Sequence, residues 1–371
     1  MSLISREIDT NGGAISFATF MELALYHPIV GYYNSPNFSL GNDGDFITAP
    51  HISSLFAKCL ARQCASILQA LSSKNILELG PGEARLTADL LHELQQQNCL
   101  PEHYFLYEIS ENLRQKQQDF LQKTCPQWMN RIVFLNEIPE KFSGLIIGNE
   151  VLDAIPVDLF AIENHTLKER CVAQKNGEFY WLNHEPQSAI FAENGAHILR
   201  QYALPNGYQS ELHLQLASFI QRISRALTQG VAIFIDYGYA EAEYYHPERT
   251  QGTLTCFYRH QKHGNPLINP GAQDITAHVN FTRVIEVAAE NGCELAGYTT
   301  QAAFLLACGL LDLAAEEEKN LSSTQEFKLH QAIKTLTLPT EMGEIVKVMA
   351  LSKHFDLPLT GFAFQDRRRD L

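Results

Sequence analysis

Short apolar runs alternate along this chain with longer stretches in which apolar residues recur every three or four positions. The short runs are typical of buried strands: Asn75–Leu79, His103–Glu108, Arg131–Leu135, Leu145–Asn149 and Val231–Asp236. The longer stretches, such as Leu86–Gln96 and Leu113–Gln122, are typical of amphipathic helices. Strands that alternate with helices form parallel sheets with helices on both faces. The sequence therefore predicts an α/β fold that binds its ligands at the carboxyl ends of the strands.

Outside this alternation, further segments indicate additional elements. We expect helices at Ser16–Leu25, Ser53–Leu71, Glu211–Leu227 and Arg283–Asn291, with Thr282 capping the last of them. Asn176-Gly177 predicts a β-hairpin within Leu167–Leu182. The segment Gly41–Pro50 is rich in Gly and Asp and is expected to be a loop. Strands at Cys293–Tyr298 and Glu344–Lys353 are expected to pair at one end of the sheet.

The charge balance narrows the class of partner. The chain has 371 residues, with 42 acidic and 28 basic side chains and a net charge of −14. This balance argues against a nucleic-acid partner and favours a cationic substrate, although acidic surfaces also serve solubility alone. We find no run of about 18 apolar residues, so no membrane span is expected. The start lacks a secretory pattern and the eight cysteines include no CxxC pair, so we expect reduced thiols and a cytoplasmic location.

The sharpest motif is the sequence ELGPGEAR, which begins at Glu78 and directly follows an apolar strand. Gly80 and Gly82 allow a ligand to approach the backbone closely. A dinucleotide-binding loop would need a third glycine where Arg85 stands, so that class of site is disfavoured. The pattern instead resembles the first motif of S-adenosylmethionine-dependent methyltransferases. We therefore assign Glu78, Gly80 and the intervening turn with Pro81 and Gly82 to cofactor binding.

Two further strand ends carry carboxylates. Glu108 ends the second strand, where a carboxylate can accept both hydroxyls of a ribose, and the alternative is a solvated acid. Asn149, Glu150 and Asp153 follow the fourth strand, where the transferred methyl group should lie. Two carboxylates in one turn suit a guanidinium, whose proton must leave as its nitrogen attacks. The alternative makes Asp153 a helix cap and Glu150 a surface acid.

Histidines supply weaker candidates. His278 can accept a proton near neutral pH, but a lone histidine is equally often structural. His260 and His263 have metal-ligand spacing without a third ligand, so we expect no metal site.

Longer segments carry a family resemblance that spans most of the chain. The sequence resembles the MidA-like family of S-adenosylmethionine-dependent methyltransferases, whose mitochondrial members are arginine methyltransferases that assist respiratory complex I assembly. The matching segments are ISFATFM from Ile15, ALYHPIVGYY from Ala24, GDFITAPHIS from Gly44, LELGPG from Leu77, YEISENL from Tyr107, NEVLDAIP from Asn149, IDYG from Ile235 and DITAHVNFT from Asp274. The segments GDFIT and NEVLDAIP are much more specific than a glycine loop.

This resemblance implies a class I methyltransferase fold: a Rossmann-like sheet of seven strands, one reversed, with an N-terminal helical and loop segment and insertions. It implies S-adenosylmethionine as the cofactor. It places Gly44, Asp45 and Thr48 over the cofactor or methyl channel, and it directs Asn149, Glu150 and Asp153 toward the acceptor. Two positions depart from the family pattern, Ala84 in place of Gly and Asn280 in place of the frequent Asp.

The expected domain organisation follows from the positions of these segments. Residues 1–60 would form an N-terminal segment that covers the active site, and residues 61–371 would form the methyltransferase core. Insertions at about 160–210 and 239–280 would form a substrate subdomain. A homodimer is also possible, although the apolar segment Phe304–Leu313 fits a core helix better than a dimer face.

The leading functional hypothesis is a protein arginine methyltransferase that acts on a partner protein, with a complex I subunit as the expected substrate. A second hypothesis is a methyltransferase for a small molecule or another protein nucleophile, because the cofactor motifs fit that reaction equally well. A third is an assembly factor that binds S-adenosylmethionine and acts mainly by holding a partner. A nucleic-acid methyltransferase is disfavoured because Asn149-Glu150-Val151-Leu152 stands where base methylation usually places an Asn/Asp-Pro-Pro-aromatic tetrapeptide.

Overall fold

The computed structural model describes residues 3–35, 38, 48–259 and 261–371, and these residues form two compact units. The first unit contains residues 1–38, 153–219 and 239–284. The second unit contains residues 39–152, 220–238 and 285–371. Each unit is therefore assembled from three separate stretches of the chain, and the chain passes several times between them.

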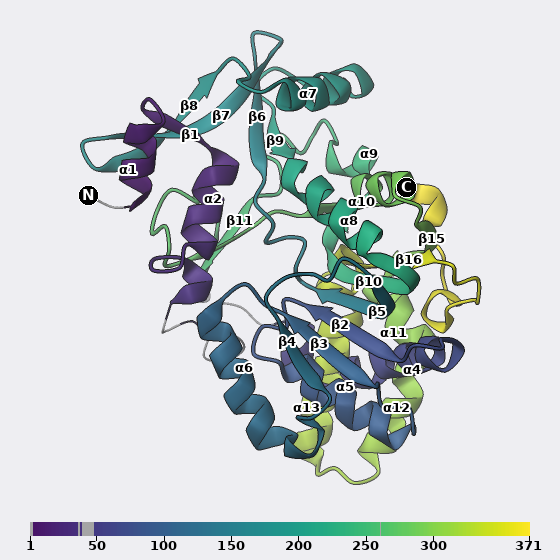
Figure 1. Ribbon diagram of the computed structural model, residues 1–371. Coiled ribbons are helices and arrows are strands. Elements are labelled where there is room, and N and C mark those ends of the chain that lie inside the picture. Colours follow the sequence, from purple (N-terminus) through teal and green to yellow (C-terminus); the bar gives the residue numbers. More distant parts are fainter. Residues whose placement is uncertain (1–2, 36–37, 39–47, 260) are drawn as a thin grey trace. The chain divides into compact units, whose positions relative to one another are not determined.

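The second unit is built on a mixed sheet (Figure 1). Among the described residues, seven strands of this sheet follow one another in the order β15-β16-β10-β5-β2-β3-β4. The short strand β14 (Val279–Asn280) falls within the residues of the first unit. The bounds of the seven strands are β2 Asn75–Leu79, β3 His103–Tyr107, β4 Ile132–Leu135, β5 Phe142–Asn149, β10 Leu227–Tyr239, β15 Glu294–Thr300 and β16 Val346–Lys353. All neighbouring pairs from β10 to β4 are parallel, and β16 is antiparallel to both of its neighbours. The expected α/β fold is thus confirmed as a mixed sheet with helices.

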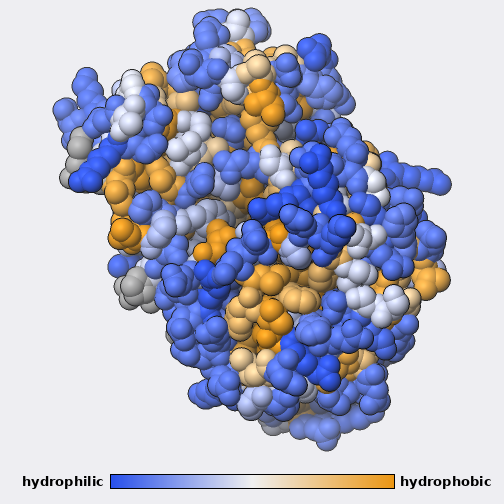
Figure 2. All heavy atoms as spheres, viewed as in Figure 1, coloured by the Kyte–Doolittle hydropathy of each residue, from blue (hydrophilic) through white to orange (hydrophobic). Residues whose placement is uncertain are grey.

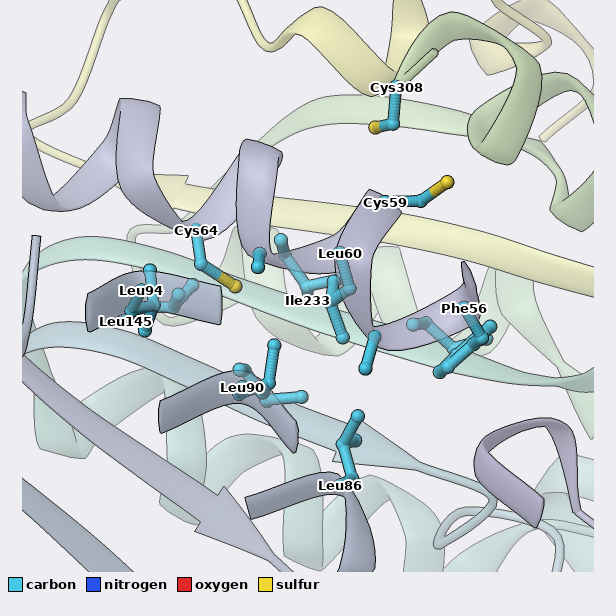
Figure 3. Packing of buried hydrophobic residues seen from close by; sticks show 14 of the residues in the cluster. Phe56, Cys59, Leu60, Cys64, Leu86, Leu90, Leu94, Leu145, Ile233 and Cys308 are labelled. Atoms are coloured by element: carbon cyan, nitrogen blue, oxygen red, sulfur yellow. The ribbon is translucent and has the colours of Figure 1, made fainter. Parts of the chain in front are cut away.

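The helices of this unit share one apolar core with the sheet. They are α3 Ala49–Ile52, α4 Ser54–Ala70, α5 Arg85–Gln96, α6 Glu111–Thr124, α11 Gln301–Ala307, α12 Leu310–Glu318, α13 Ser323–Thr337 and α14 Met342–Ile345. Figure 3 shows Leu60 of α4 and Leu90 of α5 in one cluster with Leu145 of β5 and Ile233 of β10. All four side chains are fully buried, and each buried side chain of this size contributes about 1.5–3 kcal/mol to folding. Apolar packing of this kind fixes the strand ends that carry the candidate residues.

The first unit contains two smaller antiparallel sheets. Strands β1 (Ala14–Ser16), β6 (Asp158–Glu163), β7 (Thr166–Lys175), β8 (Glu178–His184) and β9 (Gln209–Leu212) form the larger one, and β11 (Thr255–Tyr258), β12 (Gln261–His263) and β13 (Asp274–Thr276) form the other. The helices in this part of the chain are α1 Leu3–Thr10, α2 Phe17–Tyr26, α7 Ala189–Gln201 and α9 Glu241–Tyr244, with the 3₁₀ turn η1 at Tyr32–Asn34. Helices α8 (Leu214–Ala226) and α10 (Phe281–Glu290) continue from this unit into the other.

Most elements lie where the sequence predicts them. Strand β2 has the predicted bounds, and β7 and β8 form the predicted hairpin with Asn176 and Gly177 at its turn. Both turn residues have positive φ, 53° and 87°, as a two-residue hairpin turn requires. The predicted pairing of the last two sheet strands is confirmed by β15 and β16. Phe304, Leu305, Cys308 and Leu310 of the apolar segment Phe304–Leu313 lie in the core, as expected, whereas Leu311 is exposed.

Three local predictions are wrong. The helix expected from Glu211 starts at Leu214, because Gln209–Leu212 pairs with β6 as strand β9. The loop expected through Pro50 ends earlier, because the short helix α3 starts at Ala49. Thr282 does not cap helix α10.

The actual cap of α10 is Asn280. Its Oδ1 accepts a hydrogen bond from the backbone N–H of Arg283 at 3.1 Å. The hydroxyl of Thr282 instead accepts a hydrogen bond from the backbone N–H of Glu241 at 2.9 Å. A residue two positions earlier is better placed for the cap, because a cap must lie just outside the helix whose first N–H groups it satisfies.

The surface bears on the possibility of partner binding. Figure 2 shows one face of the molecule, where hydrophilic residues predominate and hydrophobic residues gather in several separate areas. The exposed large hydrophobic side chains belong to different elements, for example Leu311 of α12 and Phe327 of α13. Scattered exposure of this kind is normal and does not define a dimer face, so the homodimer stays a prediction. Within the described ranges, no helix combines the length and apolar character needed to cross a membrane.

Candidate functional site

The glycine-rich turn connects β2 to α5 at the carboxyl edge of the main sheet. Gly80 and Gly82 have left-handed backbone conformations, with φ of 57° and 55°. Ala84, at the first turn of α5, has φ of 62°. The backbone N–H of Gly80 donates to the carbonyl oxygen of Tyr107 at 2.9 Å, which ties the turn to the end of β3. The turn therefore needs glycine at two positions for conformational reasons and tolerates Ala at the third.

Glu78 lies beneath this turn and is almost completely buried. Its Oε2 accepts hydrogen bonds from the hydroxyls of Thr87 and Tyr104, both at 2.7 Å. Burial raises the pKa of Glu78, and these two hydrogen bonds act in the opposite direction. The side chain thus connects β2 with helix α5 and strand β3, and so supports the turn from within.

Glu108 follows directly after β3 and is 7% exposed. One of its carboxyl oxygens accepts a hydrogen bond from the backbone N–H of Ser110 at 2.8 Å. Burial raises the pKa of Glu108 to about 7, against the opposing effect of its hydrogen-bond donors. A carboxyl group with this pKa changes charge near neutral pH, and it is an acceptor for hydroxyl groups when ionised.

Gln117 of α6 is a residue that sequence reasoning missed. Its side-chain nitrogen donates to the carbonyl oxygen of Gly82 at 2.8 Å and lies 3.4 Å from Oε2 of Glu108. The side chain is completely buried. One amide thereby links the glycine-rich turn to the carboxylate at the end of the next strand. A polar residue on the otherwise apolar face of the predicted helix was the only signal that could have found it.

The turn after β5 carries Asn149 and Glu150, the residues of the second unit that are predicted to face the methyl acceptor. Glu150 has φ of 50°, a conformation that non-glycine residues seldom adopt. Its Oε1 accepts hydrogen bonds from the backbone N–H of Ala49 and from the side chain of Asn149, both at 3.3 Å. A Cβ atom on Gly80 would lie 3.0 Å from a methyl carbon of Val151. The turn therefore packs directly against the glycine-rich turn.

Thr48 lies immediately before α3, next to the residue that binds Glu150. Its hydroxyl lies 2.7 Å from Nδ1 of His51, and Nε2 of His51 lies 3.9 Å from a carboxyl oxygen of Glu83. Burial and the positive charge of Arg85 lower the pKa of His51. His51 was missed because a histidine within a short helix after a loop carries no motif of its own. Gly44 and Asp45 of the same predicted loop lie outside the described residues.

Asp153 belongs to the first unit, whereas Glu150 belongs to the second. The side chain of Asp153 is 8% exposed, and its carbonyl oxygen accepts a hydrogen bond from the N–H of Ala277 at 2.9 Å. The hydroxyl of Tyr26 donates to the next carbonyl, of Ala154, at 2.7 Å. These contacts hold the segment after Asp153 against helix α2 and strand β13.

An aromatic cluster at the end of α2 accompanies this segment. The ring of Tyr33 lies 5.3–5.4 Å from those of Tyr26, Tyr32 and Phe38. Its hydroxyl donates to Oδ1 of Asp274 at 2.8 Å. Burial, followed by the charge of Asp274, raises the pKa of Tyr33 well above its ordinary value, and the charge of Asp153 contributes. Tyr33 thus stays a neutral hydrogen-bond donor across the ordinary pH range.

His278 also lies in the first unit, and its backbone is well fixed. Its N–H donates to the hydroxyl of Thr253 at 3.0 Å, and its carbonyl oxygen lies 2.9 Å from Nε2 of His213. Its ring lies 5.2 Å from the ring of Tyr239. Burial lowers the pKa of His213, so that neighbouring imidazole is neutral at neutral pH. Within the described part of the chain, no group of three or more His, Cys, Asp or Glu side chains could hold a metal ion.

The family of the chain is shown by comparison with known proteins. Residues 59–299 match the family model described as "Putative S-adenosyl-L-methionine-dependent methyltransferase". The chain belongs to this methyltransferase family. The predicted MidA-like resemblance is therefore confirmed, and family membership identifies S-adenosylmethionine as the methyl donor.

A solved structure supports the same assignment over the whole chain. A protein from Burkholderia thailandensis, described as a likely methyl transferase, has a crystal structure bound to S-adenosyl-homocysteine. It is 38% identical to this chain and superposes with a TM-score of 0.93. The match covers 99% of this chain and 95% of that one. A native structure of an uncharacterized superfamily protein from the same organism is 37% identical, with a TM-score of 0.91 and the same two shares of coverage.

Curated relatives are more distant but carry a specific activity in their names. The Danio rerio protein arginine methyltransferase NDUFAF7, mitochondrial, is 28% identical over 90% of this chain and 82% of its own length. The Homo sapiens protein of the same name is 27% identical over 92% and 81%. Because these relatives are mitochondrial proteins, the predicted cytoplasmic location is contradicted and is withdrawn.

Proposed function

We propose that this enzyme transfers methyl groups from S-adenosylmethionine to arginine side chains of a partner protein. The observation that carries the proposal is the contact between two turns at the carboxyl edge of the sheet. One turn has the glycine-rich backbone of a cofactor loop, and the other holds Glu150 in a left-handed conformation against it. The names of the curated relatives, which are protein arginine methyltransferases, favour arginine as the acceptor.

The cofactor-binding residues proposed are Gly80, Pro81, Gly82 and Glu108, with Gly44, Asp45 and Thr48 over the cofactor. Gly80 and Gly82 fit S-adenosylmethionine because they have no side chain to obstruct its approach and because their backbone is left-handed. The partly protonated, nearly buried carboxyl of Glu108 fits a ribose, since two hydroxyls could donate to it in place of water. Glu78 would act on the cofactor through the turn that it supports.

S-adenosylmethionine supplies an already activated methyl group, so the protein mainly has to align the acceptor. Glu150 would orient the guanidinium and favour loss of its proton, with Asn149 fixing the carboxylate through their hydrogen bond. Asp153 and His278 are kept as further candidates for proton transfer from the acceptor. We further infer a class I methyltransferase topology, because the strand order and the single reversed strand β16 agree with that fold.

The segments of the first unit supply material for a protein-binding surface. The proposed domain division keeps residues 1–60 as a cover over the active site and assigns the insertions at about 160–210 and 239–280 to substrate binding. The family resemblance makes a respiratory complex I subunit the expected substrate. A homodimer remains compatible with this function.

The test measures methyl transfer directly. Purified enzyme is incubated with tritiated S-adenosylmethionine and a protein extract of its own cells in which the gene has been deleted. Hydrolysed product is then separated to identify the methylated amino acid. Labelled methylarginine, formed much more slowly by the Glu150→Gln variant than by the wild type, would support the proposal. Label on another residue, or on a small molecule, would replace it with the second hypothesis.

A SAM-binding assembly factor makes a different prediction for the same variant. If holding a partner is the main role, Glu150→Gln should keep both partner binding and function in cells. Loss of labelling together with loss of cellular function would favour the enzyme. Tight cofactor binding, unchanged cellular function and no labelled arginine would favour the assembly factor.

A further inference from the structure

Asp236 lies near the end of β10 and is completely buried. Its Oδ2 accepts hydrogen bonds from two successive backbone N–H groups, those of Val151 at 3.0 Å and Leu152 at 2.8 Å. Its Oδ1 accepts a third, from the N–H of Tyr237, at 2.8 Å. A buried strand carboxylate is thus used to bind the backbone of the turn that follows the neighbouring strand β5.

The adjacent backbone completes this arrangement. The carbonyl oxygen of Ile235 accepts a hydrogen bond from the N–H of Glu150 at 2.8 Å. Residues 235 and 236 therefore hold three successive amides, from Glu150 through Leu152. A left-handed conformation costs a non-glycine residue about 1–2 kcal/mol and persists only where neighbours enforce it. We attribute the φ of 50° at Glu150 to these hydrogen bonds.

The same turn sets the distance between the donor and acceptor sides of the site. Val151 packs over Gly80, since a Cβ atom added to Gly80 would lie 3.0 Å from a methyl carbon of Val151. Glu150 precedes it and carries the carboxylate proposed to face the acceptor. A shift of this short turn would therefore move the acceptor carboxylate relative to the cofactor loop, and misplacement by about 1 Å can cost about 100-fold in rate.

We propose that Asp236 is a positioning residue, which holds Glu150 at the place and angle required for methyl transfer. It acts through the backbone of Glu150, Val151 and Leu152 and contacts neither donor nor acceptor itself. The bonds that it accepts come from backbone groups, so any residue except proline could donate them from positions 151 and 152. The carboxylate at 236, by contrast, is required, because it must accept on both of its oxygens.

The test variant is Asp236→Asn, which keeps the size of the side chain. An amide has one acceptor oxygen and one donor nitrogen, so it loses acceptance on one side and places a donor against a backbone N–H. We expect the methyl-transfer rate at saturating tritiated S-adenosylmethionine to fall about 10-fold or more, with cofactor affinity in calorimetry unchanged within about 2-fold.

A second variant separates positioning from a merely structural role. If Asp236 acts through Glu150, its effect should largely disappear once the Glu150 carboxylate is gone. The rate of the Asp236→Asn/Glu150→Gln double variant should therefore lie within about 2-fold of the rate of Glu150→Gln alone. Fully multiplicative losses in the double variant would overturn the proposal.

Gln63 of α4 offers a control outside the proposed site. It is completely buried, and its Oε1 accepts a hydrogen bond from the backbone N–H of Gly361 at 2.8 Å. Gln63→Met keeps the length of the side chain but removes this acceptor, so it should lower the unfolding midpoint in urea and leave the methyl-transfer rate unchanged. An Asp236→Asn variant that lowers only stability, as this control does, would contradict the positioning role.

Because this inference rests on the proposed function, the same assay distinguishes the two failures. If the wild-type enzyme labels arginine and Glu150→Gln labels it much more slowly, while Asp236→Asn keeps the full rate, only the positioning role is wrong. If Glu150→Gln keeps the full rate, the proposed role of Glu150 is wrong and the inference falls with it. An Asp236→Asn protein that fails to fold is replaced by Asp236→Ser, whose small hydroxyl keeps one acceptor, and the same rate comparison decides.

Discussion

The hydroxyl of Tyr33 donates a hydrogen bond of 2.8 Å to the carboxyl oxygen of Asp274, 241 positions later in the chain. Asp274 is 1% exposed, so this donor replaces water that the carboxyl group would otherwise bind. The contact joins the 3₁₀ turn η1 to strand β13 within the first unit. It brings together two residues that no sequence pattern relates.

Removal of this donor should destabilise the protein. Tyr33→Phe leaves a buried acceptor with one donor fewer, which costs about 1–3 kcal/mol. Tyr26→Phe is the matched control, because the Tyr26 hydroxyl donates to a neutral carbonyl and its loss should cost only about 0.5–1.5 kcal/mol. Urea unfolding measures both costs. An equal or smaller cost for Tyr33→Phe would mean that the carboxyl group finds a replacement donor.

Cofactor affinity should depend on pH through Glu108. With a pKa of about 7, its carboxyl is protonated in a large fraction of the molecules at neutral pH. If ribose hydroxyls donate to the ionised form, affinity for S-adenosylmethionine should fall below pH 7, by up to about 10-fold per pH unit. Calorimetric titration across this range measures the slope. The control is Glu108→Gln, which should bind more weakly with a flatter pH dependence.

In the absence of cofactor, the raised pKa of Glu108 also makes the stability of the fold depend on pH. The pKa of Glu108 is raised from 4.5 in the unfolded chain to about 7 in the folded one, so the folded state binds the proton more tightly. The resulting stabilisation is fully present below pH 4.5 and is lost as the pH rises through about 7. Compared with the Glu108→Gln variant, the wild type should therefore lose stability over this window. A wild type that gains stability there would contradict the assigned shift.

The two small residues of the glycine-rich turn should respond in different ways. Gly80→Ala adds a methyl group at φ of 57°, and this group would lie 3.0 Å from Val151. We expect a loss of at least about 1 kcal/mol in stability, together with weaker cofactor binding.

Ala84→Gly is the control at the third position of the pattern. It relieves a left-handed conformation but removes a buried methyl group worth about 0.8 kcal/mol, so stability should stay within about 0.5 kcal/mol of the wild type. Thermal unfolding of both variants tests this pair. A large loss for Ala84→Gly would show that packing, not backbone conformation, decides the residue at 84.

Asn280→Asp should be destabilising even though Asp is frequent in the family at this position. The amide of Asn280 caps α10 through Oδ1 and donates through Nδ2 to a carboxyl oxygen of Glu241 at 3.1 Å. An aspartate can serve the cap but cannot donate, and it would oppose Glu241 at close range. We expect a loss of about 1–3 kcal/mol.

A compensating change at Glu241 tests this explanation. The Asn280→Asp/Glu241→Gln double variant restores a donor, because the glutamine amide can donate to the new carboxylate. Urea unfolding should show that it recovers most of the lost stability. If the double variant is no more stable than Asn280→Asp, the loss arises elsewhere, for example in the cap itself.

The succession of strands and helices could be predicted because local sequence patterns indicate which residues are buried. Asn75–Leu79 was predicted at its observed bounds, since an apolar run bounded by polar residues has one way to be buried in a parallel sheet. The order of the strand ends in the chain also placed Gly80 and Glu108 at one edge of the sheet. The prediction of a helix from Glu211 was wrong because that residue pairs with strand β6 as part of β9. This pairing is a tertiary contact, which local periodicity does not reveal.

The site was predicted only as far as motifs reach. Sequence alone gave the turn with Glu150 but not the left-handed backbone of Glu150, nor the three amides that residues 235 and 236 hold. Gln117 and His51 carry no motif, so their contacts with Glu108, Gly82 and Thr48 had to come from the fold. The roles of the candidate residues in binding and transfer stay predictions until the variants above are measured.

The sequence by itself determined the fold class, the methyl donor and the edge of the sheet at which chemistry should occur. The fold class and the sheet edge follow from periodicity and from glycine, whose conformational freedom acts locally, whereas the methyl donor follows from the family resemblance. The tertiary structure alone decided which polar groups meet, such as Asp236 with the turn at Glu150 and Tyr33 with Asp274. The reason is physical: a buried polar group needs a partner, and that partner comes from whichever segment the fold brings within hydrogen-bonding distance.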